Sequence, residues 1–498
     1  MSEVEAPART WRSRFRLIHL APILAVLALS GWIFASPIGS SPDDDFHLTS
    51  TWCANGLRTD LCEPGPSEKE RVVAPVLLHA NCYAYHPESS AECQDEYLAL
   101  DPEPSVVTER GSFEQNYPPV YYFVMNTFAS HDIQVSALVM RLLNVLLFVG
   151  ITTALYCLLP VARRGSLLWG WIITMVPLGL FLVASNNPSS WTVIGVGSSW
   201  LALVGYFESE GRRRVALGAI VALTVVMAAG ARGDGAIYSV IGMGVAAVLT
   251  FRRERRWLLS AILPAALTIL CLVLYFSSRQ ATVAVSGLHS PDAAVVPLDS
   301  FGRLAYNLLN MPSLWAGIFG TWGLGWLDTA LPAIVTLGGL AVFIAVAFTG
   351  LRLPSWRKTV MLIGLALVLW LLPAYVLYAG GNVVGENVQP RYLLPLMIVF
   401  AGVAVFRTSA LEVRFGRLQQ VFIVLALAMA QSLALHFNLR RYLTGIGEQG
   451  FNLDSGAQWW WTGLPLSPMG LWFVGSVAFA GLLYILVRQL GRQHELQQ

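Results

Sequence analysis

Lysine is almost absent from this sequence of 498 residues, where only Lys69 and Lys358 occur. Charged residues of both signs make up 12% of the chain, about half of what a soluble domain carries. This shortage excludes an ordinary soluble globular protein. The net charge is only +2, and no basic stripe with interleaved aromatic residues occurs, which excludes nucleic acid as a partner.

Apolar residues are abundant instead, at 55% of the chain with a mean hydropathy of +0.58. They come in runs of about 20 residues, the length that crosses the hydrocarbon core of a bilayer. We therefore predict an all-α polytopic protein of about twelve transmembrane helices in the lipid bilayer. The predicted spans are 17–36, 137–161, 167–184, 190–207, 215–231, 235–251, 257–278, 331–350, 359–379, 392–408, 418–436 and 469–487.

Arginine marks alternate connections between these spans. Together with the N-terminal segment, these connections hold 21 of the 32 basic residues. The positive-inside rule makes them cytoplasmic, with both termini on that side. The remaining long loops, at 37–132, 279–330, 380–391 and 437–468, are then extracytoplasmic. The first apolar run is longer than the core of a signal peptide, so we expect an uncleaved span.

Arginine in place of lysine, with much Ala, Gly and Val, favours the plasma membrane of a bacterium with a GC-rich genome. The predicted cytoplasmic connections contain no P-loop or Rossmann fingerprint, which disfavours a nucleotide-sugar substrate.

Four of the six cysteines, Cys53, Cys62, Cys82 and Cys93, lie in the first outer loop. An oxidising compartment favours two disulfides there, and no C-x-x-C pair indicates a metal site instead. Among three possible connectivities, the short loops favour Cys53–Cys62 and Cys82–Cys93.

Three consecutive acids, Asp43, Asp44 and Asp45, follow the first span, and His47 comes two residues later. If this stretch is helical, Asp43 and His47 share one face. Asp43 is then a candidate general base, and Asp43, Asp44 and His47 are candidate ligands for a divalent cation. The alternative is an acidic helix cap with no chemistry.

Six short elements occur in a fixed order along most of the chain. They are PDDDFH at 42–47, NYPPVYY at 116–122, RL at 141–142, ASNNP at 184–188, GWLDT at 325–329 and PRYLLPL at 390–396. In this order the sequence resembles the bacterial membrane-protein family of domain of unknown function 2142, grouped with the GT-C glycosyltransferases. It departs from the family pattern at Asp44 and Asp45, in its cysteine-bearing insert, and beyond about residue 410.

The resemblance implies a GT-C-like bundle with a catalytic region at 1–409, including the outer loop 37–132, and further helices at 410–498. It also implies a sugar donor linked to polyprenyl phosphate, and an acid of the first outer loop as base or metal ligand.

A lipid phosphate at the outer surface needs cationic partners. Arg391, with Tyr392 beside it, is the first candidate, and Arg232 and Arg141 are further ones; snorkelling or internal ion pairs are the alternatives. Candidate sugar contacts are Trp326, Asp328, Glu386, Tyr121 and Tyr122, with an interfacial aromatic belt as the alternative for tryptophan.

These residues predict an inverting glycosyltransferase with an envelope glycan or lipid acceptor. An arabinofuranosyl donor becomes attractive if the source is an actinobacterium. The rival classes are a transporter or flippase of lipid-linked sugars, an oligosaccharide ligase or polymerase, and a non-enzymatic assembly partner.

Overall fold

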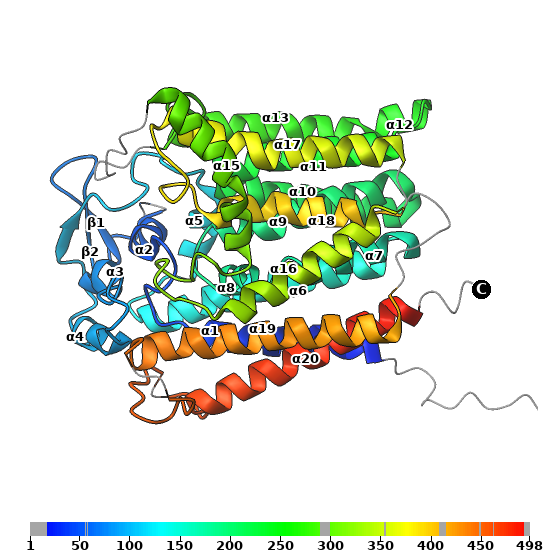
Figure 1. The fold of residues 1–498 in the computed structure, drawn as a ribbon. Helices are drawn as coiled ribbons and strands as arrows, with labels where there is room; N and C mark the ends of the chain where they lie inside the picture. Colours follow the sequence, from blue (N-terminus) through cyan, green and yellow to red (C-terminus); the bar gives the residue numbers. More distant parts are fainter. Residues whose placement is uncertain are drawn as a thin grey trace, which may run out of the picture.

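The chain folds into a bundle of helices with a small cap at one end (Figure 1). The computed structural model describes residues 17–54, 56, 58–288, 299–352, 355–407, 415–447, 450–461 and 463–492. The N-terminal arginines, Arg414 and the predicted boundary at 409/410 lie outside the described residues. The C-terminal helix ends at the end of the bundle away from the cap (Figure 1).

The elements follow in chain order. They are α1 (Ala21–Phe34, preceded by a 3₁₀ turn at Leu17–Leu20), α2 (Asp44–Trp52), β1 (Cys62–Pro64), β2 (Arg71–Val73), α3 (Pro75–His79), a 3₁₀ turn (Ala91–Gln94), α4 (Asp95–Leu98), β3 (Val106–Thr108), α5 (Val120–Asn126), α6 (Ile133–Leu158), α7 (Val161–Ile172), α8 (Leu178–Val183), α9 (Ser189–Glu208), α10 (Gly211–Ala231), α11 (Gly233–Thr250), α12 (Arg255–Ser260), α13 (Ile262–Phe276), a 3₁₀ turn (Arg279–Thr282), α14 (Val283–Ser286), α15 (Ser300–Ile318), α16 (Ala333–Gly350), α17 (Trp356–Ala379), α18 (Pro390–Ala404), α19 (Arg417–Leu443) and α20 (Pro468–Arg492).

Ten helical segments of the described chain are long and apolar enough to cross a membrane. This confirms a multi-pass, mostly helical membrane protein, and ten of the twelve predicted spans correspond to these segments. The other two predicted spans, 167–184 and 392–408, have no helix of that length. The predicted count of twelve full-length spans is therefore corrected to ten such helices in the described ranges, with shorter helices at the other two places.

Proline and burial explain the two shorter places. Pro177, which has no N–H for a helical hydrogen bond, lies between α7 and α8 and interrupts the apolar run. The 15 residues of α18 reach only about 22 Å. Thirteen of them are buried, so neighbouring helices rather than lipid surround the segment. A short helix is tolerated at membrane depth when protein encloses its ends.

The centre of the bundle is formed by α18 and α9, which pack against each other. Seventeen of the 20 residues of α9 are buried. A side chain at Gly195 would collide with the carbonyl of Thr224, so glycine is what lets α9 and α10 approach closely. This central packing fixes where the first turn of α18 meets the cap.

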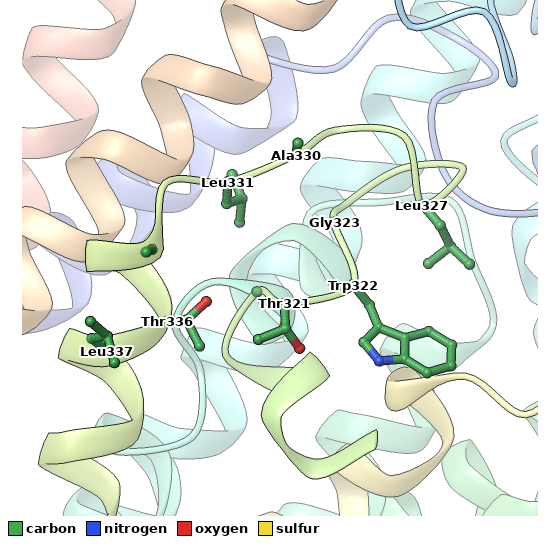
Figure 2. A pocket seen from close by; sticks show the side chains of 10 residues that line it. Thr321, Trp322, Gly323, Leu327, Ala330, Leu331, Thr336 and Leu337 are labelled. Atoms are coloured by element: carbon green, nitrogen blue, oxygen red, sulfur yellow. The ribbon is translucent and has the colours of Figure 1, made fainter. Parts of the chain in front are cut away.

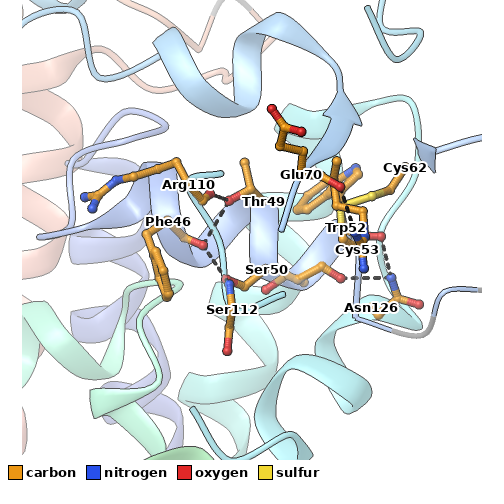
Figure 3. The surroundings of a disulfide bond; sticks show 12 residues. Phe46, Thr49, Ser50, Trp52, Cys53, Cys62, Glu70, Arg110, Ser112 and Asn126 are labelled. Carbon is orange, nitrogen blue, oxygen red and sulfur yellow. Dashed lines mark hydrogen bonds between the residues drawn. A yellow bond between two sulfur atoms is a disulfide. The ribbon is translucent and has the colours of Figure 1, made fainter. Parts of the chain in front are cut away.

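The cap is built around α2 and a three-stranded antiparallel sheet in the order β1-β2-β3. Cys53, at the C-terminal end of α2, forms a disulfide with Cys62 of β1 (Figure 3). Cys82 forms one with Cys93. Both predicted pairings are confirmed. The expected helix after Pro42 is α2, and the short helix expected around Tyr121 and Tyr122 is α5.

The disulfides give a first prediction. They close loops whose ends are 9 and 11 residues apart, which corresponds to about 2–3 kcal/mol of stability each. Replacing Cys53 and Cys62 together by serine should lower the melting temperature in detergent, measured by tryptophan fluorescence. The matched control is Cys157→Ser, which removes a thiol that forms no disulfide. Equal melting temperatures of the double variant and the control would contradict the prediction.

Candidate functional site

Asp43 stands at the N-terminal end of α2, at the junction of cap and bundle. Its φ angle of 59° is left-handed, a conformation that aspartate tolerates better than most residues. The backbone carbonyl of Asp43 accepts a hydrogen bond from the amide of His47, but the side chain makes no capping bond. The carboxylate is therefore directed to partners outside its own helix.

Two arginines from distant parts of the chain bind this carboxylate. Arg391 Nη2 donates to Asp43 Oδ2 at 2.7 Å, and Arg110 Nη2 lies 3.4 Å from Asp43 Oδ1. Arg110 also donates to both carboxylate oxygens of Asp45, from Nε at 2.7 Å and Nη2 at 3.1 Å. The Asp43 side chain is 39% exposed and that of Arg391 only 3%. The ion pair therefore links a partly exposed carboxylate to a buried guanidinium.

The charges around Asp43 determine its protonation. Burial alone raises the pKa of Asp43, but Arg391, His47 and Arg110 outweigh burial and lower the pKa to about 2. The residue is thus a carboxylate at any physiological pH, accessible from the outside and positioned by a buried cation.

The guanidinium groups of Arg391 and Arg232 both lie against the ring of Tyr392. Their guanidinium carbons are 5.2 Å and 4.7 Å from the centre of its ring. Asp234 binds Arg232 through two hydrogen bonds of 2.9 and 3.0 Å. Arg391 Nε and Nη1 and Arg232 Nη1 are buried and have no hydrogen-bond partner among the described residues. Buried donors without partners are costly, so a ligand with acceptor oxygens would satisfy them.

The side chain of His47 lies among aromatic rings beside this cluster. Its Nδ1 is 2.8 Å from the hydroxyl of Tyr122, and its ring lies 5.5 Å from that of Tyr117. Burial lowers the pKa of His47 to about 3; Asp43 opposes this shift, and the nearby arginines reinforce it. His47 is accordingly neutral, and it orients the site together with Tyr122.

Asp44 points away from Asp43, into the protein. It is fully buried, and its Oδ2 accepts a hydrogen bond of 3.3 Å from the amide of Ser41. Burial raises the pKa of Asp44 to about 7, although the charge of Arg141 acts in the opposite direction. Adjacent acids of one motif therefore have very different environments.

The directions of the Asp43, Asp44 and His47 side chains determine whether these three residues could bind one metal ion. Asp43 faces two arginines, Asp44 faces the interior, and His47 uses one ring nitrogen on Tyr122. In the described part of the chain, no group of three His, Cys, Asp or Glu side chains is placed to hold a metal. The expected ligand set does not converge, and we derive no step through a metal.

A groove opens beside the site where α15 is followed by α16 (Figure 2). Its volume is about 490 Å³, and its lining is largely apolar, with Trp322, Leu327, Leu331 and Leu337. Leu337 is 65% exposed on the outside of the bundle. A second, narrow cavity shares Trp322, Gly323 and Leu327 with this groove and extends to Arg391 and Gln389. The two spaces share part of their lining, and the inner one, with a volume of only about 20 Å³, reaches Arg391.

Three expected site residues lie apart from this cluster. Arg141 donates to the carbonyls of Ile33, Ser36 and Pro37 and so caps the end of α1. Tyr121 packs edge-on against Trp191 inside the bundle. Glu386 accepts a hydrogen bond from the amide of Val383 in its own loop.

Trp326 and Asp328 hold the GWLDT turn in place. Trp326 Nε1 donates to the carbonyl of Gly39 at 2.8 Å, and Asp328 accepts from Arg441 of α19 at 2.7 Å. Arg441 also binds the carbonyls of Tyr83, His86 and Ser89 in the cap. The turn, the cap and α19 are thereby joined around one buried arginine.

Sequence reasoning missed Arg110, Trp322 and Arg441. Arg110 is separated by 65 residues from Asp45, and it follows a strand too short to show a pattern. Arg441 was a basic residue on the predicted outer side, but several other arginines lie there as well, so the charge rule did not single it out.

Comparison with known families agrees with this architecture. Residues 26–400, about three quarters of the chain, match the family model DUF2142, described as a predicted membrane protein. The chain therefore belongs to this family. No curated protein matches the sequence.

Asp44 gives a pH prediction. Because its pKa of about 7 lies above the ordinary 3.8, the folded state keeps a proton that the unfolded state releases. Its contribution to stability is complete below pH 4 and declines as pH rises to 7, by about 4 kcal/mol at most. Asp44→Asn should flatten the decline in melting temperature between pH 5 and 8 that scanning fluorimetry finds in the wild type. Asp60→Asn, an exposed change, should keep the wild-type slope; equal slopes for all three proteins would contradict the assignment.

Proposed function

We propose that this DUF2142 member is a membrane glycosyltransferase of the GT-C type. It would move a sugar from a polyprenyl-phosphate donor to an envelope glycan or lipid acceptor at the outer face of a bacterial plasma membrane, with both termini in the cytoplasm. The observation that carries the proposal is the pairing of a half-exposed carboxylate, Asp43, with a buried arginine, Arg391, that has unpartnered donors. An acid and a cation in contact supply a base and a leaving-group stabiliser at one place.

The phosphate of the donor would bind at the start of α18. Arg391 is the second residue of this helix, where the backbone amides and the helix dipole also favour an anion. Arg391 can donate from Nε and from Nη1, which lie on different edges of the guanidinium, to separate acceptor oxygens. Arg232, whose guanidinium also lies against the ring of Tyr392, adds a second positive charge, and its partner Asp234 keeps it in position.

The lipid tail of the donor would lie in the apolar groove along the first turns of α16. The exposed Leu337 borders the region that lipid would occupy, so a chain can enter sideways from the bilayer. Trp322 and Leu327 line both the groove and the inner cavity. A small rearrangement of these two side chains would bring a phosphate at the end of the tail to Arg391.

The reaction follows as a single displacement. Asp43 accepts the proton of an acceptor hydroxyl while the oxygen attacks the anomeric carbon of the sugar. The bond from that carbon to the phosphate oxygen breaks, and the polyprenyl phosphate leaves with the electron pair beside Arg391. One displacement without a covalent intermediate inverts the anomeric configuration.

The donor itself would strengthen the base. With a pKa of about 2, Asp43 accepts a proton poorly. A phosphate at Arg391 brings negative charge next to Asp43 and shares its strongest cation, and both effects raise the pKa of a carboxylate. Asp43 would thus become an effective base after the donor is bound, which limits wasteful reaction in its absence.

Asp43→Asn tests the base. The amide keeps the shape of the side chain but cannot accept the proton, so transfer should fall by at least about 100-fold. We would incubate the purified protein with polyprenyl-phosphate sugars, arabinose and mannose among them, and envelope glycan acceptors, and follow transfer by mass spectrometry. Asp60→Asn is the matched control, because Asp60 is an exposed aspartate that pairs with Arg58. Transfer at the wild-type rate by the Asp43 variant would overturn the assignment.

Arg391→Lys tests the donor site. Lysine keeps the positive charge but lacks the planar set of donors by which Arg391 binds Asp43 through Nη2 and still offers Nε and Nη1, so the affinity for polyprenyl phosphate should fall about tenfold. Binding can be measured without turnover, by quenching of tryptophan fluorescence with polyprenyl phosphate in nanodiscs. Arg58→Lys, a change in the cap, is the control. Unchanged affinity would place the phosphate elsewhere, and movement of lipid-linked sugar across liposomes would then support the flippase alternative.

A further inference from the structure

A second, larger groove lies on the cap, on the far side of α2 from Asp43. It has a volume of about 930 Å³ and is bordered by the Cys53–Cys62 disulfide, Arg71, Phe113, Glu114 and Arg279. Nothing in the proposed reaction uses it. Its size is at the upper end of ligand pockets, which points to an extended ligand rather than a single small molecule.

The lining indicates the chemistry of that ligand. Two arginines, Arg71 and Arg279, face two glutamates, Glu68 and Glu114, so the charges balance. A balanced lining does not favour a polyanion or a cation. None of the described residues that line the groove is Leu, Ile, Val or Met, which disfavours a lipid tail. Paired acceptors and donors around one aromatic ring suit a neutral polyhydroxylated chain, whose hydroxyls both donate and accept.

Covalent and ionic contacts hold the groove open. The disulfide joins its wall at the end of α2 to β1 (Figure 3). Arg279 donates to Glu114 Oε2 at 2.5 Å, and its amide donates to the carbonyl of Gln115 at 3.0 Å. Arg71 lies over the ring of Phe113, 5.3 Å from its centre. These contacts shape the groove before any ligand arrives, which reduces the entropy lost on binding.

One chain segment connects the groove with the carboxylate site. It runs alongside α2, where the hydroxyl of Thr49 donates to the carbonyl of Arg110 and the amide of Ser112 donates to Ser50 (Figure 3). Arg110, at its start, binds Asp43 and Asp45. Phe113, three residues later, already lines the groove.

A second connection passes through the bundle. Gln280, next to Arg279, accepts a hydrogen bond through its side chain from the amide of Gly233, next to Arg232. The part of the groove lined by Phe113, Glu114 and Arg279 is therefore joined by two routes to residues of the Asp43–Arg391 site. The two ends of α2 are about 15 Å apart. A chain of several sugars is therefore needed to occupy both the groove and the Asp43–Arg391 site.

We infer that this groove binds the extended part of the glycan acceptor, while its terminal hydroxyl reaches Asp43. The inference rests on the proposed function and specifies its acceptor as a polysaccharide chain, not a single sugar or a lipid. Arg110 and Gln280 are then positioning residues that hold the groove at a fixed distance from the Asp43–Arg391 site.

The test measures binding rather than transfer, so that its outcome does not depend on catalysis. Arabinan, galactan and mannan oligosaccharides, each in short and long forms, are mixed with the wild-type protein in nanodiscs, and saturation-transfer NMR detects contact. We expect the long form of at least one glycan to bind, with its short form about tenfold weaker.

Two groove variants decide the assignment. Glu114→Gln removes the ion pair with Arg279, and Arg71→Gln removes the cation over Phe113; each should weaken binding of the long glycan about tenfold. Glu88→Gln, an exposed change whose partner is His86, is the matched control. Wild-type affinity in both groove variants, or no binding of any glycan by the wild type, would overturn the inference. Glycan binding that persists while the Asp43 variant transfers normally would instead count against the proposed reaction.

Discussion

The ion pair between Asp43 and Arg391 is the contact on which the arrangement of this protein depends. Arg391 opens a helix that the bundle encloses almost completely, and a guanidinium there needs an anionic partner to offset its lost hydration. Asp43 supplies that partner from the cap, at the price of a left-handed backbone conformation. The pair fixes the cap on the bundle, brings α2 over the start of α18, and leaves further donors of Arg391 for a ligand.

Hydropathy predicted ten of the membrane helices, the enclosed α9 among them, and failed where proline interrupts an apolar run or where the helix within the run is short. The apolar run at 167–184 contains Pro177, and the run at 392–408 forms a 15-residue helix enclosed by neighbours. Both satisfy a hydropathy window without being full spans, because a window measures composition and not surroundings. The disulfides were predictable, because the short sequence separations within one loop favour pairing each cysteine with its neighbour in the chain.

The site could be predicted only in part, because a sequence motif does not determine the direction of each side chain. PDDDFH gave both Asp43 and Asp44, yet one faces Arg391 at the surface and the other is buried. GWLDT looked like a sugar-binding element, whereas Trp326 and Asp328 bind Gly39 and Arg441. Arg110 completes the carboxylate environment from 65 residues away from Asp45, and only the tertiary fold brings them together.

Arg441 shows that the chain does not divide into independent parts at the end of the family model. The family model ends at residue 400, yet Arg441 on α19 neutralises Asp328 inside the matched region and ties three cap carbonyls together. Helix α20 packs along α1, the first span of the chain. A protein cut at the family boundary would keep every motif but would bury a carboxylate without its counter-charge. Helices α19 and α20 thus support the region that the family model covers, and a truncation at residue 400 would remove that support.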